Sequence, residues 1–297
     1  MNHMQRREQL RGIALTIIGG IFWGLAGVCG QYLFEERGLT AKWLVSVRLV
    51  LAGLILLLTV WAKQKKQMFE IWREKRDVFQ LIMFGIFGMA FCQLSYYVAV
   101  ETSATVLQYT APIIIMLYVS VRNKKVPQRI EMLALVLAVG GTFLLATHGN
   151  ITNLAISTET LVWGLASAVA MALYNLIPGE LMKKFGTFNV IGWGMLIGGI
   201  FLCVFIKPWH VIGMWDIYTV LAMAAVILVG TILSFTTYME GVRLIGASKA
   251  SLFASVEPVT ATFMTVVFMG AAFQFVDFIG LAGILGAVLM LSLLKKE

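Results

Sequence analysis

Charged side chains are scarce in this sequence. Of its 297 residues only 13% are charged and 60% are hydrophobic, and the mean hydropathy is +0.87. A water-soluble domain has about 25% charged residues, so the composition excludes an ordinary soluble protein. The apolar residues come in continuous runs of about 20, the length with which a helix crosses a bilayer core. Unpaired backbone groups are excluded from that core, and runs without strict alternation favour helices over a β-barrel.

Residues for catalysis and metal binding are equally sparse. The sequence contains no Gly-x-Ser-x-Gly, His-Glu-x-x-His or phosphate-binding Gly-Lys-Ser/Thr motif. The histidines lie in a tail or at span ends, and the cysteines lie inside apolar runs at unrelated spacings, as small buried hydrophobic residues do. These residues are His3, His148 and His210, and Cys29, Cys92 and Cys203. We therefore expect no cofactor, no metal and no enzymatic activity, which excludes an intramembrane protease, a zinc enzyme and an ATP-driven pump.

The apolar runs predict ten membrane-spanning helices. Residues 1–11 are short, polar and basic, and the following run lacks a small-residue cleavage site, so we interpret it as a retained first span. The predicted spans cover residues 13–34, 43–61, 78–98, 102–120 and 130–147, and then 161–178, 188–206, 217–239, 250–270 and 275–294.

The basic residues alternate between the two sides of these spans. Arg37, Lys42 and Lys207 lie in the outer gaps and Arg48 lies inside a span, whereas the rest of the 23 Lys and Arg residues lie in the tails and inner gaps. The positive-inside rule then predicts cytoplasmic amino and carboxyl termini. The net charge of +8 is spread over short gaps and forms no single stripe, so we expect no nucleic-acid partner.

The sequence repeats itself. Trp23-Gly24-Leu25-Ala26 recurs as Trp163-Gly164-Leu165-Ala166, and each copy opens a block of five predicted spans. An odd number of spans inverts the second block relative to the first. Inverted repeats facing each other across a membrane are a common basis of carriers that open to alternate sides.

Three motifs accompany this repeat: Phe22-Trp23-Gly24, then Val106-Leu107-Gln108-Tyr109 with Ala111-Pro112, and Val256-Glu257-Pro258-Val259. With them the chain resembles the drug/metabolite transporter superfamily, specifically its EamA-type ten-helix permeases. The resemblance implies an all-α integral membrane protein of ten transmembrane helices in two inverted five-helix EamA repeats, at residues 12–147 and 160–294. It also implies a permease or exporter of small metabolites. The first span holds no acidic residue, so the cation–proton exchange of the four-helix multidrug exporters is not supported.

Polar and aromatic side chains gather on several spans and form the candidate substrate site. An apolar wall with a few hydrogen-bonding groups is typical of a small-molecule pocket, and amides and tyrosines suit a zwitterion such as an amino acid. A packing role is the alternative for each of them. The candidates are Trp23, Tyr97, Gln108, Tyr109, Trp163, Asn175 and Tyr238.

Two prolines and two charges lie inside the predicted spans. Pro112 and Pro258 correspond across the repeat, and each is expected to kink its helix as a gate or as a static bend. Glu257 is expected to be a proton-coupling carboxyl or, as the favoured alternative, a structural group bonded to backbone that Pro258 frees. Arg48 is expected to extend outward, to form a structural pair with Glu257, or to meet a substrate carboxylate.

These features together predict a secondary transporter of small metabolites in a bacterial plasma membrane, with amino acids or similar zwitterions as substrates and alternating access between the repeats. An uptake carrier for a quaternary ammonium compound is one alternative, because aromatic faces bind such cations. A sensor or enzyme that binds without transport is another. The expected partners are the substrate and the lipid bilayer, and both a monomer and a homodimer stay open.

Overall fold

The computed structural model describes residues 3–101, 105–149, 158–269 and 274–293, and every regular element in these ranges is helical. The first half contains α1 (His3–Glu35), α2 (Ala41–Gln64), the 3-10 helix η1 (Lys65–Trp72), α3 (Lys75–Met83), the π-helix η2 (Phe84–Phe91), α4 (Cys92–Glu101), α5 (Thr105–Gln108), α6 (Ala111–Asn123) and α7 (Arg129–Thr147). The second half contains α8 (Thr158–Leu176), α9 (Gly179–Phe185), α10 (Thr187–Ile206), α11 (Ile217–Ile227), the π-helix η4 (Leu228–Leu233), α12 (Ser234–Ile245), α13 (Ala247–Phe253), α14 (Val256–Met269) and α15 (Phe275–Leu293).

These helices confirm the predicted all-α membrane fold. Within the described ranges, nine segments are long and apolar enough to cross a membrane, and Ala111–Asn123 is a shorter apolar helix. The third span of each half is continuous, because α3, η2 and α4 follow one another without a break, as do α11, η4 and α12. The fourth span of each half is instead broken, between α5 and α6 and between α13 and α14.

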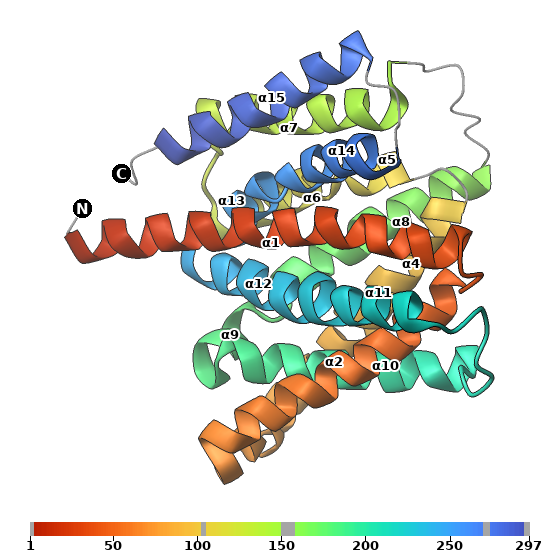
Figure 1. The fold of residues 1–297 in the computed structure, drawn as a ribbon. Helices are drawn as coiled ribbons and strands as arrows, with labels where there is room; N and C mark the ends of the chain where they lie inside the picture. Colours follow the sequence, from red (N-terminus) through yellow and green to blue (C-terminus); the bar gives the residue numbers. More distant parts are fainter. Residues whose placement is uncertain (1–2, 102–104, 150–157, 270–273, 294–297) are drawn as a thin grey trace.

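The two halves pack as an inverted pair. In Figure 1, α1 and α8, the first helices of the halves, run through the bundle in opposite directions, and α1 begins on the side where α15 ends. The second spans α2 and α10 pack together, and so do the fifth spans α7 and α15. The first span α1 packs on α12 in the third span of the other half, just as α8 packs on η2 and α4. Exchanging the halves therefore maps this set of contacts onto itself.

The fifth spans meet closely at one crossing. A Cβ added at Gly141 of α7 would lie 2.5 Å from the carbonyl oxygen of Gly280 on α15, and one at Gly280 would lie 2.6 Å from the carbonyl oxygen of Gly141. The absence of side chains at these glycines lets the two backbones approach each other.

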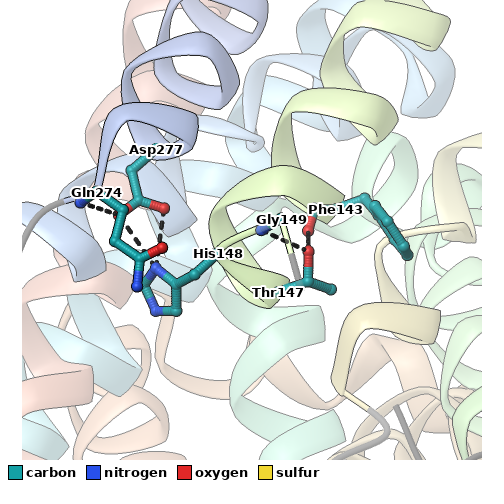
Figure 2. Close-up of polar contacts among 6 residues, drawn as sticks. All are labelled: Phe143, Thr147, His148, Gly149, Gln274 and Asp277. Atoms are coloured by element: carbon teal, nitrogen blue, oxygen red, sulfur yellow. Dashed lines mark hydrogen bonds and ion pairs between the residues drawn. The ribbon is translucent and has the colours of Figure 1, made fainter. Parts of the chain in front are cut away.

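A polar contact fixes the ends of the same two helices. His148 ends α7 with a φ of 50°, and its Nδ1 lies 2.9 Å from a carboxylate oxygen of Asp277 in the first turn of α15. Figure 2 shows this ring facing the carboxylate, which also accepts a hydrogen bond from the backbone N–H of Gln274. Asp277 is fully buried, so the contact supplies its carboxylate with partners and holds the end of repeat one to the last helix of repeat two.

Candidate functional site

A cavity of about 580 Å³ lies between the two halves. Small-molecule sites have volumes of about 300–1,000 Å³, so the space is sufficient for a metabolite. Its wall comes from α1, α2, α4, α5 and α7 of the first half and from α8, α11, η4, α12 and α14 of the second. No single repeat encloses the cavity, and a change in the relative position of the halves therefore changes its shape.

The cavity extends toward the face where α1 ends. Its wall follows α1 from Trp23 to Glu35, the last residue of the helix, and includes Ala146 near the end of α7. Toward the other face α1 packs tightly, because a Cβ added at Gly12 would lie 2.5 Å from Cγ2 of Ile245. The described cavity thus reaches from the middle of the bundle toward one side of it.

Ion pairs join the halves on the opposite face. The ammonium of Lys184 in α9 lies 2.6 Å from a carboxylate oxygen of Asp77 in α3 and 3.1 Å from one of Glu74. Lys249 in α13 lies 3.7 Å from Glu131 in the first turn of α7. Each pair connects the second half to the first, so these contacts stabilise the packed arrangement of the face that the cavity does not approach.

Both prolines lie at the start of a helix and not at a kink within one, which differs from the prediction. Pro112 is buried in the first turn of α6, after a break at residues 109–110. Pro258 is buried in the first turn of α14, after a break at residues 254–255. Neither proline bends a continuous helix, because a proline in the first turn replaces an N–H that has no intrahelical partner. Discontinuous helices at corresponding positions are typical of the binding sites of carriers with inverted repeats.

Residues beside these breaks lie in the cavity wall. Gln108 and Tyr109 line the cavity at the break in span four, and Glu257 lines it at the break in span nine. The side-chain oxygen of Gln108 accepts a hydrogen bond from Ser167 on α8, a contact between the halves.

Glu257 is partly exposed and lines the cavity. Among the described residues it has no ion pair or side-chain hydrogen bond to a protein group. The expected structural bond to backbone freed by Pro258 is therefore not made, and the carboxylate is open to a cation, a proton or a polar ligand that enters the cavity.

An aromatic cluster forms the deep side of the wall. The ring of Trp23 lies 5.1 Å from that of Phe235 in an edge-on arrangement and 4.8 Å from that of Tyr238. Tyr174 lies 5.6 Å from Phe235, and its hydroxyl is buried without a partner among the described residues. Trp23, Tyr174 and Phe235 line the cavity, so its deep end is apolar with one unsatisfied hydroxyl.

Other predicted site residues lie outside the wall. Tyr238 and Asn175 are buried behind it, where the Tyr238 hydroxyl donates to the Asn175 side-chain oxygen and the Asn175 amide donates to the carbonyl of Met171. Both support wall residues and do not line the cavity. Trp163 is half-buried away from the cavity. The side chain of Tyr97 lies outside the described residues.

Arg48 is buried in the wall, with only 7% of its surface exposed. Its Nη2 donates to the side-chain oxygen of Gln93 at 2.7 Å, and its Nη1 donates to the hydroxyl of Thr231 at 3.5 Å. The guanidinium therefore does not extend to the end of the span. Sequence reasoning missed Thr231 and Ser167, because single hydroxyl residues in long apolar runs give no periodic signal.

Comparison with known proteins agrees with this architecture. The model of the EamA-like transporter family matches the chain twice, at residues 10–147 and 158–293. An uncharacterized inner membrane transporter, YicL of Salmonella typhimurium, is 34% identical over 95% of each chain. An uncharacterized transporter, YwfM of Bacillus subtilis, is 26% identical over 95% of this chain and 94% of its own.

A solved crystal structure has the same fold. It superposes with a TM-score of 0.77 at 16% sequence identity, over 94% of this chain and 95% of the other. The names of the relatives indicate a transporter rather than an enzyme. The chain is thus a multi-pass membrane protein, and with two matches that span nearly its whole length it belongs to the EamA-like transporter family.

Proposed function

We propose that the protein is a secondary transporter that moves small metabolites by alternating access, with amino acids or similar zwitterions as its substrates. The observation that carries this proposal is the cavity of about 580 Å³ that both inverted halves enclose and that approaches one face. A binding site at the interface of inverted repeats can be exposed to either side by rocking one repeat against the other. A static receptor has no need of such an interface.

The two repeats, residues 12–147 and 160–294, are the moving units in this proposal. Both termini are cytoplasmic and the membrane is a bacterial plasma membrane, so the cavity approaches the outer face and the ion pairs of Lys184 and Lys249 close the inner face. The breaks before Pro112 and Pro258 act as hinges, because residues between helical segments can absorb changes in φ and ψ.

Opposite charges in one wall support a zwitterionic substrate. The guanidinium of Arg48 and the carboxylate of Glu257 both line the cavity. A ligand with one anionic and one cationic end would satisfy both, which lowers the cost of keeping charges at membrane depth. Trp23, Gln108 and Tyr109 are the proposed apolar and hydrogen-bonding contacts of the remaining atoms, with Asn175 and Tyr238 behind them.

A quaternary ammonium substrate is the second candidate. Trp23, Tyr109, Tyr174 and Phe235 supply aromatic faces in the wall, and such faces attract cations without an anionic partner. The two candidate substrates differ in their interaction with Arg48, since its guanidinium attracts the carboxylate of a zwitterion and repels a purely cationic ligand. Competition by choline-like amines and by amino acids for the same labelled substrate separates them.

Counterflow in liposomes tests the proposed function. Purified protein is reconstituted into vesicles loaded with an unlabelled amino acid, and the entry of the labelled amino acid is measured for a panel of amino acids and cationic amines. We expect transient accumulation of at least one zwitterion. Binding without counterflow across the whole panel would instead indicate a sensor.

A pair of glycine variants provides the control. Gly27 lines the cavity and Gly140 lies on the exposed face of α7, and a Cβ added at either would meet nothing within 4 Å. Both sites therefore accept a larger side chain without a clash inside the protein. Gly27→Phe should fill the cavity and abolish counterflow, whereas Gly140→Phe should retain it. Equal counterflow by the two variants would indicate that the substrate does not pass through this cavity.

A further inference from the structure

Arg48 carries a buried positive charge at membrane depth. An arginine inside a membrane span is costly to insert, and such residues face a functional cavity or a partner. Its guanidinium lines the cavity and donates to Gln93 and Thr231. Both of these acceptors are neutral oxygens, which orient the donor fork but are weaker partners than a carboxylate.

The two acceptors come from the third span of each half. Gln93 lies in α4, two residues after the end of the π-helix η2, and Thr231 lies in the π-helix η4. π-helical segments are rare and occur frequently at functional sites. The Thr231 hydroxyl donates its proton to the carbonyl of Val226 at 2.8 Å, so it faces Arg48 as an acceptor. Arg48 therefore connects the third spans of both repeats, close to one π-helix through Gln93 and within the other through Thr231.

We propose that Arg48 is the receptor for the carboxylate group of the substrate. The guanidinium fork matches a carboxylate with two parallel hydrogen bonds, and the cationic end of the same ligand lies toward Glu257 on α14. A bound carboxylate replaces the neutral oxygens of Gln93 and Thr231 as acceptors. Occupancy then weakens one bridge between the repeats, which connects binding to their relative movement. This inference rests on the proposed function for its substrate class but concerns binding, which is measured separately from transport.

Thermal stabilisation of the purified protein tests this assignment. A panel of L-amino acids is compared with the carboxamides of the same amino acids, which keep the ammonium and the side chain but lack the negative charge. A ligand that binds the folded state raises its midpoint of unfolding with concentration. We expect the acids to bind wild-type protein about tenfold or more tightly than their amides, since hydrogen bonds between charged groups are the stronger class.

Two variants assign the preference to this residue. Arg48→Gln should bring the ratio of acid to amide affinity close to unity. Gln93→Glu keeps Arg48 and places a protein carboxylate within its reach, so it should weaken acid binding through occupation of the receptor even if Arg48→Gln fails to fold. Gln128→Glu is the matched control, because it makes the same change at an exposed residue before α7, on the face that the cavity does not approach.

The outcomes are distinct. Loss of the acid preference in Gln93→Glu, and in Arg48→Gln where that variant folds, with the preference kept in Gln128→Glu, supports the assignment. Equal binding of acids and amides by wild-type protein, no stabilisation by any acid, or an unchanged ratio in Gln93→Glu would overturn it. Failure of the proposed function has a different signature, since acids would then bind through Arg48 without counterflow.

Discussion

Replacing Gly141 with alanine should destabilise the protein, because α7 and α15 cross at backbone contact. The added methyl group would lie 2.5 Å from the carbonyl oxygen of Gly280 and 2.9 Å from Cγ1 of Ile284, where ordinary contacts begin at 3.4 Å. The helices must separate locally by roughly an ångström, and overpacking of this kind costs about 1–3 kcal/mol. Gly140 is the adjacent control, since a Cβ there meets nothing within 4 Å.

The assay is the midpoint of thermal unfolding of both variants in the same detergent. A change of 1 kcal/mol shifts the midpoint by about 2–4 °C in a chain of some 150–250 residues, so Gly141→Ala should melt roughly 2–12 °C below wild type. Gly140→Ala should melt within about 2 °C of wild type. If the two variants melt together, the fifth spans do not cross at these glycines and the described packing between the repeats is wrong.

Three further substitutions test the ion pairs of the inner face, the cavity wall and the loop before α11. Lys184→Gln removes the pairs with Asp77 and Glu74, so it should raise protease sensitivity at the inner face; unchanged cleavage would show that these pairs do not hold the face closed. Glu257→Gln should lower zwitterion affinity about ten- to a hundredfold and abolish any effect of a pH gradient on transport, whereas retained coupling would exclude this carboxylate. Hydrogen bonds from the backbone N–H of Thr219 hold the pKa of Asp216 below its usual value, so its contribution to stability is present above the unfolded pKa and is lost as pH falls through the folded pKa. When the midpoint of thermal unfolding is measured over a pH series, Asp216→Asn should lack the decrease that wild type shows at acid pH. The same pH dependence in both proteins would contradict this prediction.

The architecture could be predicted from the sequence, because the length and hydropathy of the apolar runs determine it. Continuous apolar runs of span length require helices in a bilayer, and the duplicated Trp-Gly-Leu-Ala motif with five spans per copy predicts the inversion. The same reasoning placed Trp23, Gln108 and Tyr109 in a candidate site, and the structure places all three in one wall.

The details of the site depend on tertiary contacts that leave no periodic signal. Tyr238 and Asn175 satisfy each other behind the wall, although their residue types match those of the lining. The breaks beside Pro112 and Pro258 look like kinks in sequence, because a first-turn proline and a mid-helix proline differ only in whether the preceding residues stay helical. The partners of Arg48 lie in distant spans, one in each repeat.

Alternating access makes its most direct prediction at Gly27, which is exposed within the cavity on α1. Gly27→Cys, with Cys29, Cys92 and Cys203 replaced by serine, is labelled in oriented vesicles by a small thiol reagent that does not cross the bilayer. We predict labelling from the outer face in the resting protein and, during exchange of a transported substrate, labelling from the inner face as well. A residue reachable from one face alone under every substrate condition would contradict the account.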